Sequence, residues 1–158
     1  MSDSKSNKNK DFFGNGHWEF HGEMSPENYF GFTYLVVCTK TDKQYVGRKQ
    51  YKHAGKTTSR HHGKETNWRT YIGSSTHLKA HIEQVGYEHM RFICLGEYSC
   101  KGDLVYAETE EQVKRDVLRA KGEDGKRKFY NGQIAAIKFI PANKPFNYNQ
   151  ELEDEFTI

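Results

Sequence analysis

The stretch FTYLVVCTKTDKQYVGRKQY, residues 32–51, constrains the fold of this chain more than any other segment. Two runs of β-branched and aromatic residues flank the polar residues KTDK, a pattern typical of a β-hairpin. With a two-residue turn at Thr41–Asp42, Tyr34 would face Lys49 and would share a face of the strand pair with Lys49 and Tyr45. A one-residue change of register would separate the two tyrosines. Tyrosines on strands mostly serve packing, so a chemical role needs support from elsewhere in the chain.

A long polar loop and a helix are predicted to follow the hairpin. Residues 51–69 carry Gly, Lys, Ser, Thr and His with little that is apolar, and long loops in compact domains are often functional. After the loop, Ser75 can cap a helix whose apolar stripe contains Leu78 and Ile82. Gly86 stands where such a helix would end in a left-handed conformation.

The second half of the chain adds a strand and another helix. MRFICLGEY, residues 90–98, predicts a third strand, and a second helix is predicted from an N-cap at Asp103 to Gly122. These elements predict a small α/β (α+β) domain with a central three-stranded antiparallel sheet that starts with a β-hairpin and is flanked by helices. The predicted organisation is a disordered tail at 1–11, an aromatic leader at 12–29, the domain at 30–141 and a C-terminal tail at 142–158.

Length and composition exclude several classes of protein. The 158 residues suit one domain, and the mean hydropathy of −0.95 comes with no apolar run long enough to cross a membrane. The first residues lack the apolar stretch of a secretory signal, so we expect a cytoplasmic protein. Cys38, Cys94 and Cys100 form no CxxC pair, which argues against a disulfide framework and a zinc ribbon.

Basic residues are concentrated in the middle of the chain. Between Lys40 and Arg69 there are nine Lys or Arg residues against only Asp42 and Glu65. Aromatic residues are interleaved with them, as a surface for a phosphate backbone requires, although a solvated lysine-rich loop would share this composition. The predicted DNA contacts are Lys49, Lys52, Lys56, Arg60, His61, His62 and Trp68.

The histidines of this region allow a second interpretation. His53, His61 and His62 could form a zinc site with Cys94 or Cys100. Their spacing matches no short pair of zinc ligands, which makes phosphate contact or proton transfer the better interpretation of His61 and His62.

Four motifs in order resemble the GIY-YIG nuclease superfamily, and within it the stand-alone Seg-type endonucleases of phages. The hairpin carries FTY at 32–34 and YVG at 45–47, which resemble the two triads of that family. The literal YIG at 71–73 follows a loop and cannot be the second strand of the hairpin. Phe32 departs from the motif glycine, and Gly31 stands one place early. The remaining motifs are NWRTYIGSSTHL before the first helix, GDLVYAE in the second helix and FYNG near the end.

The resemblance implies a DNA endonuclease that hydrolyses phosphodiester bonds with one divalent metal ion, Mg²⁺ or Mn²⁺, and no organic cofactor. It favours Glu108 over Glu111 as the metal ligand, although both carboxylates lie on the same helical stripe. Tyr34 or Tyr45 would position or deprotonate the attacking water, which requires cations near a phenol whose ordinary pKa is about 10. Asn131 would orient its neighbours.

The arginine that the family carries on its first helix has no match at the usual place. Arg48, Arg60 and Arg69 are candidates for the cation that stabilises charge on phosphorus, and Lys49 is a substitute. Arg69 has the best sequence argument because it lies just before the predicted helix.

Two other functions remain open at this stage. A catalytically inactive nucleic-acid-binding module on the same fold would explain Phe32 and the displaced arginine. A small assembly protein whose basic loop binds an acidic partner would explain the charge pattern. If the chain is a nuclease encoded by a phage, the homing type and the cytoplasm of the host cell are expected.

Overall fold

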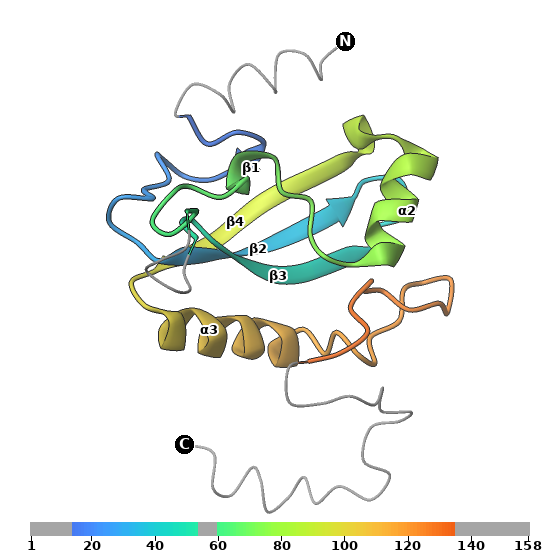
Figure 1. Ribbon diagram of the computed structural model, residues 1–158. Coiled ribbons are helices and arrows are strands. Elements are labelled where there is room, and N and C mark those ends of the chain that lie inside the picture. The colour runs from blue at the N-terminus through green and yellow to red at the C-terminus, as the bar shows by residue number, and fades with distance from the viewer. Residues whose placement is uncertain (1–13, 54–59, 135–158) are drawn as a thin grey trace, which may run out of the picture.

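A four-stranded sheet with one helix on each side forms the body of the molecule (Figure 1). The computed structural model describes residues 14–53 and 60–134. The predicted tails at 1–11 and 142–158, and the predicted DNA contact Lys56, lie outside these residues. The strands are β1 (Trp18–Glu19), β2 (Gly31–Cys38), β3 (Gln44–Gln50) and β4 (Met90–Tyr98), and they stand in the order β1-β4-β2-β3.

The predicted hairpin forms from β2 and β3, but its turn is longer than predicted. A loop from Thr39 to Lys43 joins the strands, and within it Asp42 has a positive φ of 64°. Tyr34 therefore stands opposite Gly47, two residues from its predicted partner. Because side chains alternate with a period of two, a shift of two residues keeps every side chain on its predicted face. The prediction that Tyr34 and Tyr45 share a face is confirmed.

The sheet has one strand more than predicted. β4 has the predicted bounds and pairs antiparallel with β2, with an irregularity in register between Thr33 and Tyr34. The extra strand, β1, comes from the aromatic leader and runs parallel to β4 for only two residues. It brings Trp18, which is 1% exposed, into the core. A two-residue strand is too short to show any periodicity, so its sequence gave no signal.

The first predicted helix is α2 (Thr76–Val85), and its capping is as expected. The Ser75 hydroxyl accepts a hydrogen bond from the backbone N–H of Leu78 at 3.2 Å. At the other end Gly86 has a φ of 98°. Two short 3₁₀ turns, η1 (Trp68–Thr70) and η2 (Tyr87–His89), precede and follow this helix.

The second predicted helix is α3 (Lys101–Lys114), and both of its predicted ends are wrong. Cys100 holds the N-cap position, and Asp103 lies in the first turn, where its charge still interacts favourably with the helix dipole. The helix ends eight residues before Gly122, because Asp116 takes a positive φ of 54° and turns the chain. Val117 and Leu118 then pack into the core beside the sheet.

Apolar side chains fill both sides of the sheet. One cluster joins Phe32, Tyr34 and Val36 to Leu78 of α2, and the other joins Val46 to Val117 and the residues after it. In Figure 1, α3 runs beneath the sheet, while α2 and the leader lie on its other side. β3 stands at the edge of the sheet, and its side chains point alternately to the α2 side and the α3 side.

Two expectations from composition can be compared with this fold. Cys38 and Cys94 are buried free thiols, and Cys100 is an exposed one. Among the described residues, no helix has the length and apolar character that crossing a bilayer requires.

Candidate active site

A pocket of about 530 Å³ opens beside β3, at the edge of the sheet. Its walls come from segments that are far apart in the chain. They are Tyr34, Tyr45 and Arg48 of the hairpin, Ser74–His77 at the start of α2, Glu108 and Gln112 of α3, and residues 130–133. Several candidates from the sequence therefore meet at one place.

Two phenols line the sheet side of the pocket. The rings of Tyr34 and Tyr45 lie 6.1 Å apart between centroids. Tyr34 is 1% exposed, whereas Tyr45 is half-buried and its hydroxyl lies 3.3 Å from the Ser74 hydroxyl. Burial raises the pKa of both phenols, because an ionised phenol loses its hydration there. Both therefore remain protonated at neutral pH.

Arg48 and Glu108 approach the pocket from the other face of the sheet. Alternation along β3 directs Arg48 away from Tyr45 and toward α3, where its guanidinium donates to the Glu108 carboxylate at 2.9 Å. The side chain of Glu108 is only 14% exposed, and burial raises its pKa while Arg48 acts in the opposite direction. The site thus wraps around the edge strand, with phenols on one face and an ion pair on the other.

Asn131 supports β3 rather than reaching into the pocket with free groups. Its side-chain oxygen accepts from the backbone N–H of Val46 at 3.0 Å, and its side-chain nitrogen donates to the carbonyl of Val46 at 2.8 Å. Gln112 also donates to this carbonyl, at 3.4 Å. Asn131 is 3% exposed, and both ends of its amide are used.

The oxygen groups around Glu108 fit a hard divalent cation. Glu108 is the one acidic residue of the pocket wall, and its neighbours there offer hydroxyl and amide oxygens. Mg²⁺ commonly binds through one or two carboxylates, several waters and a substrate phosphate. Within residues 14–53 and 60–134, three or more His, Cys, Asp or Glu side chains nowhere gather into a metal-binding group. A single-carboxylate site completed by substrate is the arrangement that these residues allow.

Residues 17–134, well over half of the chain, match the family model SegE_GIY-YIG, described as "Putative endonuclease segE, GIY-YIG domain". The match spans every strand and helix described above. The chain belongs to the SegE GIY-YIG endonuclease family. No curated protein and no solved structure matches it. The predicted family and fold class are confirmed, with a sheet of four strands instead of three.

The glycine of the second GIY-YIG triad has a steric role. Gly47 lies opposite Tyr34 in the hairpin, and a Cβ atom there would stand 2.4 Å from the Tyr34 hydroxyl oxygen. Contacts below 3.0 Å do not occur without movement. Tyr34 can lie across the strand only because residue 47 has no side chain.

We expect Gly47→Ala to destabilise the domain by about 1–3 kcal/mol, the usual cost of forcing an extra methyl group into a packed site. The added methyl would also displace the Tyr34 ring from the pocket, so cleavage should fall even where the protein remains folded. Urea unfolding and a cleavage assay would measure the two effects. Gly22→Ala is the control, since Gly22 lies outside the pocket wall and a Cβ there meets nothing within 4 Å. Unchanged stability of the Gly47 variant would contradict the steric role.

The departure of Phe32 from the first triad leaves the pocket unchanged. Phe32 is fully buried among Trp18 and Tyr51 and does not line the pocket. Gly31, one place earlier, is needed for packing, because a Cβ there would stand 2.4 Å from the carbonyl oxygen of Lys49 in β3 and 2.8 Å from a methyl carbon of Leu104 in α3. This glycine lets α3 approach the sheet and brings Glu108 within reach of the pocket.

Arg69, the arginine favoured by sequence, does not line the pocket. Its guanidinium donates to the carbonyl of Gly14 at 2.9 Å and to the Glu65 carboxylate at 3.0 Å. It also lies over the Trp68 ring, 4.3 Å from the centroid. Arg48 is the candidate that the structure places beside Glu108. Side chains alternate between the two faces along β3, and this alternation directs Arg48 toward α3.

The prediction that Trp68 contacts DNA is wrong. Trp68 is fully buried and packs edge-on against Tyr51, so no ring face is open to a base or sugar. An aromatic residue in a polar stretch looked exposed in the sequence, but this one anchors the loop to the core.

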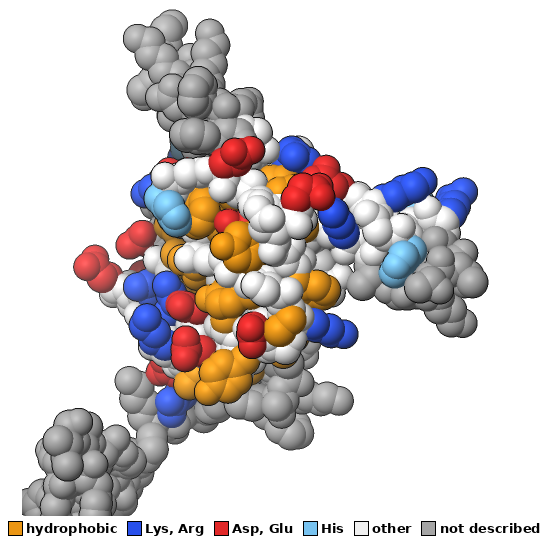
Figure 2. Space-filling view, turned by 90° about the vertical axis from the view of Figure 1, so that its left-hand side faces the viewer, with side chains coloured by type: hydrophobic (Ala, Val, Ile, Leu, Met, Phe, Trp, Pro, Cys, Tyr) orange, Lys and Arg blue, Asp and Glu red, His pale blue; other side chains and the backbone are white. Residues whose placement is uncertain are grey.

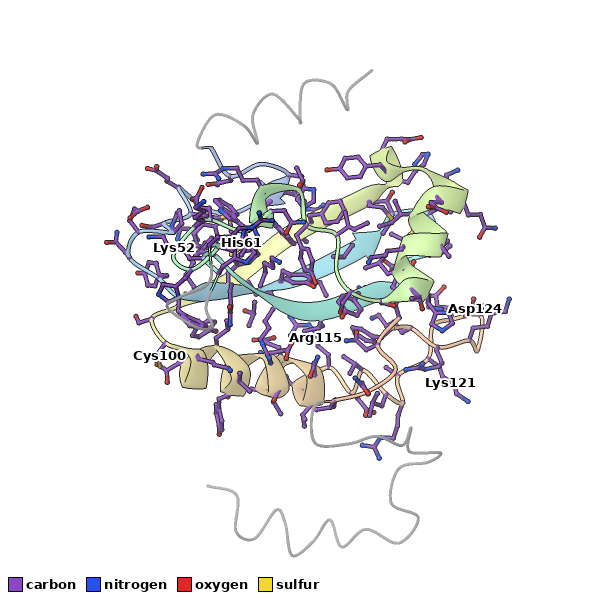
Figure 3. The ribbon with its side chains drawn as sticks, viewed as in Figure 1. Lys52, His61, Cys100, Arg115, Lys121 and Asp124 are labelled. Atoms are coloured by element: carbon purple, nitrogen blue, oxygen red, sulfur yellow. The ribbon has the colours of Figure 1, made fainter. Side chains whose placement is uncertain are left out.

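The other predicted DNA contacts lie mostly on the surface, away from the pocket. Lys52 pairs with Glu27 at 3.2 Å, while Arg60, His61 and His62 are exposed. Figure 3 shows Lys52 and His61 at the end of the sheet opposite α2. Lys49 instead lies over the Tyr71 ring at 4.0 Å, and burial lowers its pKa. On the face seen in Figure 2, basic and acidic side chains alternate instead of forming a surface of one sign.

The described residues do not support the zinc interpretation. The rings of His53 and His61 lie 5.5 Å apart, but Cys94 is buried in the sheet. Cys100 and His61 are on opposite sides of the sheet in Figure 3. Tertiary folding separates these residues, which the linear spacing could not show.

Several pocket residues were not predicted from sequence. They are Ser74, Ser75, Thr76, His77, Gln112, Tyr130, Gly132 and Gln133. The Ser75 cap predicted a helix start with polar groups, but only folding brings this helix start beside Tyr45. Tyr130 is brought there by the bridge between Gln44 and Phe129, a long-range contact.

Proposed function

We propose that this chain is a DNA endonuclease that hydrolyses phosphodiester bonds with one divalent ion, Mg²⁺ or Mn²⁺. The observation that carries this proposal is the convergence of Tyr34, Tyr45, Arg48 and Glu108 on one pocket at the sheet edge. Membership of an endonuclease family supports it independently. The homing type found in phages is proposed from the resemblance alone.

The scissile phosphate would enter the pocket between the phenols and the ion pair. Arg48 would turn part of its guanidinium from Glu108 to the phosphate and stabilise the charge that develops on phosphorus. The phenol O–H groups of Tyr34 and Tyr45, protonated at neutral pH, would orient the attacking water and a phosphate oxygen. Asn131 would act indirectly: its hydrogen bonds to Val46 would hold β3 in place, and with it Tyr45 and Arg48.

Glu108 would hold the metal ion through the carboxylate that now accepts from Arg48. The ion, when bound, supplies positive charge that stabilises the phosphoryl group and the leaving oxygen. Burial raises the pKa of Glu108, so its ionised form costs free energy in this pocket. Binding of a cation would compensate for that cost.

DNA outside the pocket would follow β3 toward the basic loop. The strand leads from the pocket to Lys52, and Arg60, His61 and His62 lie exposed in the same part of the molecule. These groups can neutralise backbone phosphates without reading sequence. The resulting affinity should fall steeply as salt concentration rises.

The proposal is tested by incubating the full chain with supercoiled plasmid. We expect nicked or linear DNA with Mg²⁺ or Mn²⁺ and intact DNA with EDTA. Retention of DNA without nicking, with either metal, would support the inactive binding module instead. Absence of DNA binding even at low salt would support the assembly protein with an acidic partner.

A further inference from the structure

His77 is a titratable side chain in the pocket that the proposed function has not used. It is the second residue of α2, its side chain is exposed, and it forms part of the pocket wall. Nothing in the described part of the chain forms a hydrogen bond or ion pair with its ring. The imidazole can therefore turn toward a water or a substrate group in the pocket.

The other candidates for accepting a proton from the attacking water are poorly suited to it. Tyr34 is buried, and the Tyr45 hydroxyl lies within hydrogen-bond distance of Ser74. The raised pKa of both phenols further disfavours their anionic forms at neutral pH. An efficient base has a pKa near the working pH, which histidine offers among the common side chains.

The charged and titratable groups around His77 come from every wall of the pocket. The sheet presents Tyr34, Tyr45 and Arg48, α3 presents Glu108, and the segment after α3 presents Tyr130. Glu108 is engaged with Arg48, and the Tyr130 hydroxyl is bonded to His81. His77 is the one histidine among the pocket residues.

Resting on the proposed nuclease function, we propose that His77 is the catalytic base that takes a proton from the attacking water. One O–H bond of the water breaks, its proton moves to a ring nitrogen of His77, and its oxygen forms the new bond to phosphorus. The bond from phosphorus to the leaving oxygen breaks, and that oxygen takes a proton from solvent. The imidazolium then returns its proton to solvent, so the enzyme regains its initial state.

The test is the pH dependence of single-turnover cleavage by wild type and by His77→Gln. Wild type should show a rate that rises tenfold per pH unit at acidic pH and then levels off once the base is unprotonated. His77→Gln should cleave roughly 10²-fold more slowly at the plateau, the lower end of what general-base catalysis contributes. It should also lose the increase in rate with pH at acidic pH, which is the rising limb of the pH profile. In His77→Ala, added imidazole should restore part of the rate.

Controls separate the base from other origins of the same profile. His21→Gln removes an exposed histidine outside the pocket and should leave the profile unchanged. Replacing Mg²⁺ with Mn²⁺ should leave the midpoint of the wild-type limb in place, whereas ionisation of a water on the metal would shift it. Tyr45→Phe should lower the rate but retain the limb.

Two results would overturn the assignment. One is a His77→Gln variant that keeps both the wild-type rate and the limb. The other is a limb that disappears in Tyr45→Phe and survives in His77→Gln, which would make the phenol the base. If wild type cleaves no DNA with either metal, the nuclease proposal itself fails, and this outcome is distinct from both.

Discussion

Glu108→Gln is expected to lower the rate of DNA cleavage by about 10³-fold, the equivalent of roughly 4 kcal/mol of transition-state stabilisation. The amide keeps the size of the side chain but cannot supply the charge that a divalent ion needs. DNA binding should be retained, because Lys52 and the basic residues near it lie outside the pocket that contains Glu108. A gel assay for plasmid cleavage and a filter assay for binding would measure the two effects.

Glu110→Gln is the matched control, since Glu110 lies two residues along α3 with its side chain exposed. It removes the same charge from the same helix and should leave cleavage unchanged. Wild-type cleavage by the Glu108 variant would remove Glu108 from the metal site.

The same Glu108 variant has an expected signature in stability. Burial raises the pKa of Glu108 in the folded state, so the folded protein holds this proton more tightly than the unfolded chain does. The ionised carboxylate therefore costs stability above its folded pKa, and this cost disappears as the pH falls through that pKa. Glu108→Gln should be at least as stable as wild type at pH 7, and the gain should shrink at acidic pH. Thermal unfolding across this range would show it, and a gain that grows toward acidic pH would contradict it.

Arg48→Gln is expected to slow cleavage by roughly 10²–10³-fold, the usual loss when one preorganised donor to a developing negative charge is removed. Arg69→Gln is the comparison that matters, because the sequence favoured Arg69. Arg69 contacts Gly14 and Glu65 at the surface, so its loss should change the rate by only a few-fold. A larger defect in the Arg69 variant than in the Arg48 variant would reverse the assignment. Measurement under single-turnover conditions with saturating protein separates the chemical step from binding.

Elements with a strong local pattern were predictable from the sequence. The alternation of β2 and β3, the apolar run of β4 and the Ser75 cap of α2 each depend on neighbours within a few residues. The end of α3 was not predictable, because Asp116 stops the helix although ordinary helix-forming residues follow it. β1 was missed because its partner lies more than seventy residues away.

The site was predictable in its chemistry but not in its assembly. Tyr34, Tyr45, Glu108 and Asn131 were found through motifs, and all four lie at the pocket. The choice between Arg48 and Arg69 depended on which face of β3 Glu108 approaches. This follows from how α3 packs on the sheet. The polar wall at Ser74–His77 was missed for a similar reason, since only folding brings α2 beside Tyr45.

The contact between Asn131 and Val46 also fixes which residues of β3 meet the pocket. An edge strand without a second neighbour can slide along its partner, and a slip of one residue would exchange the faces of Tyr45 and Arg48. The amide of Asn131 occupies both the N–H and the carbonyl of one residue in that strand, as a further strand would. Together with the backbone bridge between Gln44 and Phe129, this side chain fixes the alignment of β3, with the phenol and the guanidinium on opposite faces. Aspartate at position 131 has no N–H group, so the hydrogen bond to the Val46 carbonyl would be lost.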